Sequence, residues 1–211
     1  MKRTLLLSLL VFLLILGGCA KTASFDTPSE EWSDPLIVTS QNSDAVEMLF
    51  DDGLLKFRIN GKESYVYSIF DGAEQKNVAI ETTMFNNGSQ INNASILCRV
   101  NKDNSAWYEF HVASEGTYGL LRYDKSLKDA GKIPWVTLVK SGSSKAISNV
   151  KPNVIKAVCD GTKLTLTVND TLLFEKENGD ITEAGQVGLG AIAYDALPVV
   201  IGFDDFKIST P

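Results

Sequence analysis

Three side chains that suit ligand binding alternate along one segment of this sequence. Trp107, Glu109 and His111 stand at every second position of Ala106–Val112. In an extended strand, residues spaced this way point to the same side. An indole can stack on the apolar face of a pyranose ring, and a carboxylate can accept hydrogen bonds from its hydroxyl groups. The segment therefore predicts a polar and aromatic strand face that is suited to a polyol.

The segment before it is expected to pair with it as a hairpin. A turn at Asn101–Asn104 makes Arg99 face Trp107 and Leu97 face Glu109, which adds Arg99 to the ligand face. Arg122, on the next predicted strand, would extend this face. The alternating residues on the other side are apolar or aromatic and predict a core face: Ile96, Cys98, Val100, Tyr108, Phe110 and Val112. The alternative interpretation is a diagonal ion pair between Arg99 and Glu109, with Trp107 only filling sheet surface.

A second predicted hairpin shows a clear alternation of apolar and polar residues. Asp160-Gly161 is a hairpin turn signal, and Asn169-Asp170 is a weaker one. If Cys159 faces Leu164, then Ala157 faces Leu166 and Ile155 faces Val168, all on one apolar side. This alternation is typical of a sheet that has one side against a core.

The rest of the sequence repeats this pattern and predicts one all-β domain. Strands are expected at 45–50, 54–59, 64–70, 78–85, 95–100, 106–112, 118–123, 135–139, 154–159, 163–168, 172–176, 186–193 and 199–208. One helical turn fits Lys125–Gly131, and residues 25–44 read as an irregular opening segment. Many short strands separated by turns favour a two-sheet antiparallel jelly-roll sandwich.

The sequence does not support nucleic-acid binding, a zinc site, a serine nucleophile or a phosphate-binding loop. The formal charge of −6 gives no electrostatic attraction to nucleic acid, and no basic cluster reverses it. One histidine cannot build a zinc site without other strong ligands. No G-x-S-x-G nucleophile elbow and no glycine-rich phosphate loop are found. A further prediction is a calcium site formed by Asp204 and Asp205 with Asp26 or Asp51-Asp52. The alternative is a β-bulge with solvated aspartates.

The first residues predict export and lipidation. Lys2 and Arg3 precede the apolar run Leu5–Leu16, which is too short for a confident membrane span. The run ends in Leu16-Gly17-Gly18-Cys19, which resembles the bacterial lipobox. That resemblance implies a signal peptide over 1–18, a lipid on Cys19, a tether over 19–24 and a domain over 25–211. Loss of Lys2 and Arg3 changes the charge from −6 to −8. The alternative is an ordinary secretory signal that happens to contain a cysteine.

Lipidation of Cys19 leaves two other cysteines. Cys98 and Cys159 both lie on predicted core faces, and an exported protein can hold a disulfide. A bridge would close a loop of about 60 residues and add roughly 4 kcal/mol. The alternative is a pair of buried free thiols, because cysteine packs well as a small apolar residue.

Three segments carry a resemblance to a known fold family. They are Ser95–Phe110, Val154–Glu175, and Val187-Gly188-Leu189 with Phe203-Asp204-Asp205-Phe206. The chain is similar there to laminin-G and concanavalin A-like jelly rolls, whose relatives include 3-keto-disaccharide hydrolase-like domains. It departs from the pattern at Asp170, where glycine is usual, and at Ala106-Trp107, which replaces an aromatic pair. The resemblance implies two curved antiparallel sheets and a tendency to bind glycans. The E-x-D-x-x-E motif of concanavalin-like glucanases is absent from the sequence.

These observations lead to one expected function and two alternatives. The expectation is a lipid-anchored cell-envelope protein that binds a carbohydrate on a concave sheet face without catalysis. The lipobox resemblance implies the outer membrane in a Gram-negative host, and otherwise the outer face of the cytoplasmic membrane. The first alternative is a structural module whose same face docks a protein partner. The second is a glycoside-acting hydrolase, which would need a second carboxylate or a metal beside Glu109.

Overall fold

The computed structural model describes residues 21–27 and 29–211, and its regular secondary structure is almost entirely β-strand. An eight-stranded sheet, here sheet A, contains β1 (Lys21–Ala23), β3 (Val46–Asp51), β4 (Leu54–Ile59), β6 (Val78–Asn86), β11 (Asn153–Asp160), β12 (Lys163–Val168), β13 (Thr171–Glu177) and β15 (Val199–Ser209). A seven-stranded sheet, here sheet B, contains β2 (Leu36–Thr39), β5 (Ser64–Gln75), β7 (Asn92–Val100), β8 (Ala106–Val112), β9 (Thr117–Asp124), β10 (Trp135–Ser143) and β14 (Gly185–Ala193).

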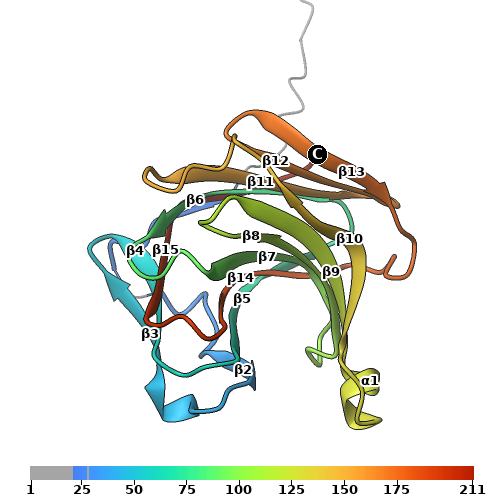
Figure 1. The fold of residues 1–211 in the computed structure, drawn as a ribbon. Coiled ribbons are helices and arrows are strands. Elements are labelled where there is room, and N and C mark those ends of the chain that lie inside the picture. The colour runs from blue at the N-terminus through green and yellow to red at the C-terminus, as the bar shows by residue number, and fades with distance from the viewer. Residues whose placement is uncertain (1–20, 28) are drawn as a thin grey trace, which may run out of the picture.

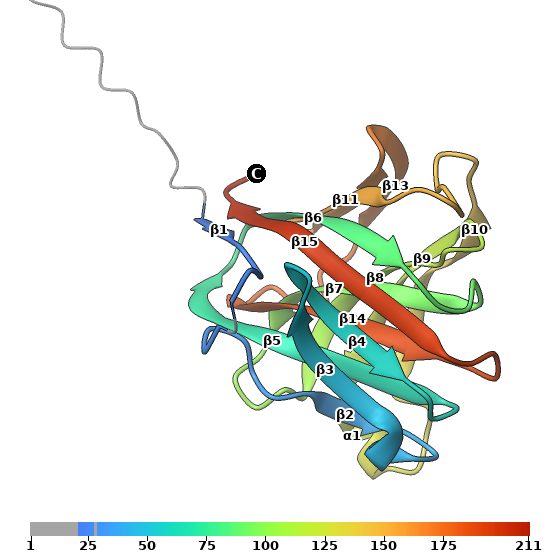
Figure 2. The ribbon, with the colours of Figure 1, turned by 90° about the vertical axis from the view of Figure 1, so that its left-hand side faces the viewer.

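The two sheets form the sandwich that the sequence predicted. Sheet A runs β13-β12-β11-β6-β15-β4-β3, with β1 beside β15, and sheet B runs β10-β9-β8-β7-β14-β5-β2. The registered pairs within both sheets are antiparallel. Sheet B arches, and its concave side faces away from sheet A (Figure 1). In the view at right angles, β15, β4 and β3 of sheet A lie in front of strands of sheet B (Figure 2).

Within the residues that the structure describes, helical structure is confined to two short pieces. A 3₁₀ turn spans Ser43–Ala45, and α1 spans Lys125–Asp129, where one helical turn was expected. The Asp124 side chain caps α1 by accepting a hydrogen bond from the Ser126 backbone N–H. The predicted irregular opening segment also contains β2, which pairs with β5 at the edge of sheet B.

The hairpin register predicted for β11 and β12 is confirmed. Cys159 pairs with Leu164, Ala157 with Leu166, and Ile155 with Val168. Gly161 has a φ of +56°, so the turn uses a conformation that glycine adopts without steric cost. In the next turn, Asn169 and Asp170 both have positive φ, as a type I′ hairpin requires. Asp170 therefore takes a left-handed backbone conformation that glycine adopts more readily than other residues.

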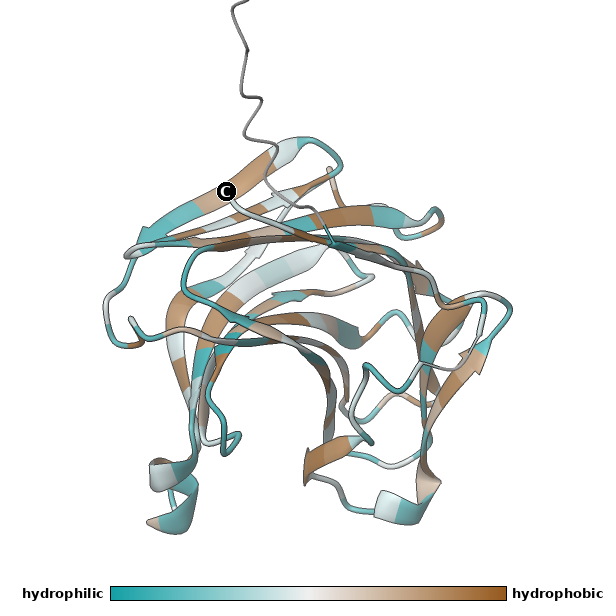
Figure 3. Cartoon of the chain, turned by 180° about the vertical axis from the view of Figure 1, so that it is seen from behind, coloured by the Kyte–Doolittle hydropathy of each residue, from teal (hydrophilic) through white to brown (hydrophobic). Residues whose placement is uncertain are grey.

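The core between the sheets is formed by the alternating apolar residues of both layers. Apolar positions alternate with hydrophilic ones along many strands, and hydrophilic residues gather in the loops (Figure 3). Ile96, Cys98, Tyr108, Phe110 and Val112 are buried in this core, as predicted from the sequence. A disulfide between Cys98 of β7 and Cys159 of β11 joins sheet B to sheet A through the core.

The N-terminal strand β1 lies within the segment that the sequence predicted as a tether. Lys21 pairs with Ile208 and Ala23 with Phe206, so the described part of the predicted tether is a strand of sheet A. Residues 1–18 and the predicted lipidation site Cys19 lie outside the described residues. Within the described residues, no helix is long and apolar enough to cross a membrane.

Candidate ligand-binding site on the concave sheet

The concave side of sheet B carries a second apolar cluster. Val38, Tyr67, Ile69, Leu97, Val100, Trp107 and Tyr123 are buried there, with Leu36, Tyr65 and Trp135 packed against them. The ring of Tyr123 stacks on Trp107 at 3.9 Å between centroids, and the ring of Tyr67 meets the indole edge-on at 5.3 Å. Trp107 is therefore on the predicted side of the sheet but is 0% exposed, and it offers no free face to a sugar. The expectation that its indole is an open stacking surface is wrong.

Glu109 is buried below the same aromatic side chains. Its carboxylate accepts hydrogen bonds from the Tyr67 hydroxyl at 3.0 Å and from the Ser95 hydroxyl at 2.7 Å. Burial raises the pKa of Glu109, and these two hydrogen bonds act in the opposite direction. The buried indole N–H groups of Trp107 and Trp135 have no hydrogen-bond partner among the described residues. Glu109 thus links Tyr67 to Ser95 through hydrogen bonds and is not accessible to a ligand in solvent.

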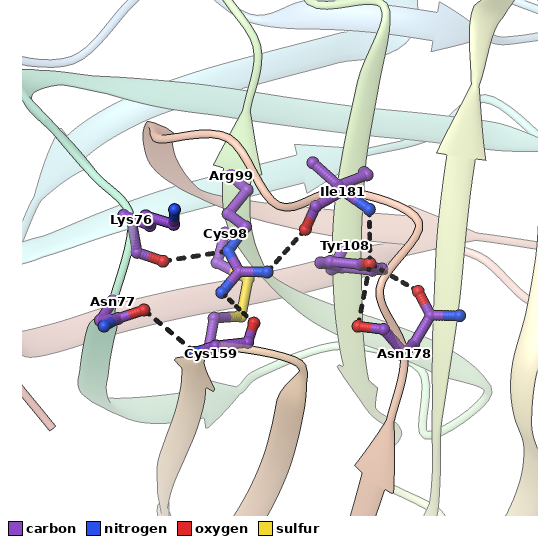
Figure 4. Close-up of a disulfide and its surroundings, with 9 residues drawn as sticks. Lys76, Asn77, Cys98, Arg99, Tyr108, Cys159, Asn178 and Ile181 are labelled. Atoms are coloured by element: carbon purple, nitrogen blue, oxygen red, sulfur yellow. Dashed lines mark hydrogen bonds between the residues drawn. A yellow bond between two sulfur atoms is a disulfide. The ribbon is translucent and has the colours of Figure 1, made fainter.

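Arg99 lies on the opposite side of the sheet from its predicted position. Its φ of +53° and the register shift beside it mark a β-bulge, which turns two successive side chains to the same face. Val100 therefore joins the concave cluster, and the Arg99 guanidinium points toward the edge of the inter-sheet core. It donates to the backbone oxygens of Lys76 at 3.0 Å, Ile181 at 2.6 Å and Gly161 at 2.6 Å (Figure 4). The prediction of Arg99 as a ligand-binding residue is wrong.

Arg122 also lies on the side of sheet B opposite to the concave face. It pairs with Tyr108, whose side chain lies in the inter-sheet core, whereas the neighbouring Tyr123 pairs with Trp107 on the concave side. The Arg122 Nη1 atom lies 2.7 Å from an Asp180 carboxylate oxygen, and Nη2 lies 3.6 Å from Asp124. The expected Arg99–Glu109 ion pair is likewise absent from the described residues.

His111 is the predicted ligand-binding residue that lines an open cavity on the concave face. The cavity has a volume of about 410 Å³ and lies at the end of the concave face, between β10 and the residues around Asn93 and Tyr194. The imidazole packs against Gly119, where a Cβ atom would lie 2.6 Å from Nε2. Burial lowers the pKa of His111 to about 4, so the ring is neutral at pH 7. Its Nδ1 atom has no hydrogen-bond partner among the described residues.

The wall of this cavity is aromatic and comes from strands that are far apart in sheet B. Tyr65 of β5 packs against Trp135 of β10 with ring centroids 4.3 Å apart, and Tyr194 meets Tyr65 edge-on at 6.2 Å. The Asn93 amide donates to the Tyr194 hydroxyl at 2.7 Å, which fixes that ring at the cavity. Ring faces beside amide and hydroxyl groups are what a small polar ligand with apolar patches requires.

Four of these cavity residues were not recognised as site residues from the sequence. They are Tyr65, Asn93, Trp135 and Tyr194. Tyr65 and Tyr67 alternate, so their shared face was visible in the sequence. Contact between Tyr65 and Trp135 depends on the arch of sheet B, which residue alternation does not encode.

The aspartates considered for calcium lie near one another but are engaged elsewhere. Asp26, Asp204 and Asp205 line a shallow cavity beside β1. Asp205 has a φ of +53° in a β-bulge of β15, and its carboxylate accepts a hydrogen bond from Thr83. Asp51 and Asp52 both pair with Lys56 at 2.8 Å. No group of three or more metal-ligating side chains within residues 21–27 and 29–211 is arranged to hold a metal ion.

Comparison with known proteins identifies the fold. No protein-family model matches this sequence, and no curated protein matches it. The carbohydrate-binding module CBM66 from Bacillus subtilis is 13% identical, with a TM-score of 0.60 over 85% of this chain and 96% of that one. A Bacillus subtilis protein of unknown function with a galectin-like fold is 11% identical, with a TM-score of 0.62 over 91% and 98%.

An enzyme shares the same architecture. The beta-glucanase of Bacillus licheniformis is 9% identical, with a TM-score of 0.63 over 92% of this chain and 100% of that one. The chain therefore has a concanavalin A-like and galectin-like jelly-roll fold. Both binding modules and hydrolases use this fold, so function has to be argued from the site.

Proposed function

We propose that the protein binds a carbohydrate in the concave cavity lined by Tyr65, Asn93, His111, Trp135 and Tyr194. The observation that carries this proposal is the meeting of aromatic rings with neutral hydrogen-bonding groups around one open cavity. Sugar rings present C–H faces that stack on aromatic side chains and hydroxyl groups that bond to amides and imidazole. Carbohydrate-binding modules and glucanases among the structural neighbours support the same class of ligand.

We further propose that binding occurs without catalysis. Glycoside hydrolysis generally uses two carboxylates about 5–9 Å apart at the scissile bond. Among the described residues that line the cavity, Glu115 is the one carboxylate. Glu109 is fully buried and its hydrogen bonds are made to Tyr67 and Ser95. A hydrolase remains the second candidate because glucanases share the fold, and it predicts product release from an oligosaccharide on prolonged incubation.

A lipid anchor at Cys19 completes the proposal. The supporting observation is the sequence around Cys19, in which a basic start, an apolar run and small residues precede the cysteine in order. Several acyl chains on one cysteine would hold the domain firmly at a membrane, because each buried methylene contributes about 0.8 kcal/mol. Cys19→Ser would release the protein from membranes, and unchanged sedimentation with membranes would contradict the anchor.

Binding is tested with the full chain in detergent on a glycan array, followed by calorimetry of the glycans that bind. Thr137 is exposed and lines the cavity, so Thr137→Trp should block the site without unfolding the domain. Thr171→Trp places the same side chain at an exposed position on β13 of sheet A and should leave binding unchanged. No binding of any glycan at millimolar concentration, or equal binding by the two variants, would overturn the proposal.

A further inference from the structure

The charges around the concave cavity are of one sign. Glu115 is the one formally charged residue among the described residues that line it, and no lysine or arginine does so. His111 adds no positive charge at pH 7, because burial lowers its pKa to about 4. The groups left to bind a ligand are aromatic rings, hydroxyls, amides and a neutral imidazole.

Two further carboxylates affect the walls of the cavity. Burial raises the pKa of Tyr65 and of Tyr194, and the charges of Glu63 and Glu109 raise both further. The negative field of these groups therefore extends to two of the rings that enclose the cavity. In a partly buried site such a field is weakly screened and acts on a charged ligand more strongly than in water.

The two arginines that could offset this negative field, Arg99 and Arg122, make their contacts outside the cavity. Recognition of carboxylate or sulfate groups commonly uses a guanidinium that donates two parallel hydrogen bonds. The Arg99 guanidinium donates to three backbone oxygens on the far side of sheet B. Arg122 pairs with Asp180 outside the concave cluster. An anionic sugar in the cavity would lose hydration and meet carboxylates in place of a cation.

We propose that the concave cavity selects uncharged saccharides and rejects those that carry a carboxylate or sulfate group. This inference rests on the proposed carbohydrate-binding function and specifies its ligand class. The stacking rings and neutral donors accept a hexose whose C6 carries a hydroxyl group. The same ring with a C6 carboxylate would gain repulsion from Glu115, the carboxylate that lines the cavity. Discrimination should therefore appear between ligands of nearly identical shape.

Calorimetry with matched pairs of neutral disaccharides and their C6-oxidised uronic acid forms tests the inference. The full chain at pH 7 and low salt should bind the neutral member at least about 10-fold more tightly. The part of the preference that comes from the exposed Glu115 carboxylate should shrink at high salt, because salt screens charges at the surface. Glu115→Lys should reduce the preference or reverse it, which is measured as the ratio of the two affinities within that variant.

A control variant tests whether the preference depends on the position of the charge. The outcomes also separate a failure of this inference from a failure of the proposed function. Glu183→Lys makes the same charge change at an exposed residue that does not line the cavity, so it should keep the wild-type preference. Uronic acid binding as tight as neutral sugar binding would overturn this inference and leave the proposed function standing. An unchanged preference in Glu115→Lys would also overturn it. Absence of binding by both members of every pair would overturn the proposed function itself.

Discussion

Tyr65 and Trp135 meet across the concave face of sheet B with ring centroids 4.3 Å apart. They belong to β5 and β10, and β9, β8, β7 and β14 lie between these strands in the sheet. The contact is made across the arch of the sheet (Figure 1). It covers the aromatic cluster around Trp107 and leaves the cavity beside His111 open.

Trp135 should therefore be required for ligand binding. Trp135→Ala removes one wall of the cavity and the partner of Tyr65, and we expect at least about a 10-fold loss of affinity, as for aromatic anchors at other binding sites. Trp135→Phe keeps a ring at the position and should retain most of the affinity. Calorimetry with a bound glycan measures both. Full affinity in Trp135→Ala would show that the ligand lies elsewhere.

Trp107 should act on stability instead. The indole is fully buried between Tyr123 and Tyr67, so Trp107→Ala should lower the free energy of unfolding by about 3–5 kcal/mol. Urea denaturation followed by circular dichroism checks this value. Leu172→Ala, at a position that is 59% exposed, is the control and should cost little. A Trp107 variant of normal stability that loses ligand binding would restore the open-platform interpretation.

Arg99 should be a structural residue without a role in binding. Its three hydrogen bonds join the backbone near Lys76, Gly161 and Ile181. A hydrogen bond to a charged group contributes about 1.5–3 kcal/mol, so Arg99→Met should cost about 3 kcal/mol or more in unfolding free energy. Arg58→Met breaks an exposed pair with Glu47 and should cost less than about 1 kcal/mol. Equal losses in the two variants would contradict this assignment.

The disulfide should contribute substantially to stability. Cys98 and Cys159 are separated by 61 residues, and closing a loop of that length is worth about 4 kcal/mol in the chain-entropy account. Cys98→Ala with Cys159→Ala should therefore unfold at lower urea concentration. Mass spectrometry after alkylation of the unreduced protein gives an independent check. Two alkylated thiols in addition to any at Cys19 would show that the bridge does not form.

His111 should make stability fall in mild acid. The ring has a pKa of about 4 in the folded protein and about 6.5 in the unfolded chain, so the unfolded state binds more protons between these values. This contribution is full above pH 6.5, declines as the pH falls and is lost below about pH 4, with a total near 3 kcal/mol. His111→Gln should remove this part of the pH dependence. Parallel stability curves for the two proteins over that range would contradict the prediction.

Residue alternation predicted the strands and much of their register. Cys159 opposite Leu164 and Leu97 opposite Glu109 follow from period-two patterns and turn residues. The face of Arg99 could not be predicted in this way, because a bulge reverses the alternation and the local sequence contains no glycine to indicate it. Val100, expected in the inter-sheet core, moves to the concave cluster for the same reason.

The candidate site was less predictable than the fold. Its residues are brought together by the curvature of sheet B, which depends on twist and packing summed over many strands. Tyr65 and Trp135 are 70 residues apart in sequence, 135 − 65, and no local pattern relates them. His111 was identified because it alternates with Trp107 and Glu109, although its two neighbours proved to be covered.

The pairing of β1 with β15 has a consequence for how the protein would meet its surroundings. Cys19 precedes Lys21 by two residues, and Lys21 is already hydrogen-bonded into sheet A. If Cys19 is acylated, only one residue separates the lipid-bearing residue from β1. Sheet A would then lie close to the lipid headgroups. The arch of the other sheet would then open toward the extracytoplasmic medium, where long soluble polymers could reach it before any neighbouring bilayer component.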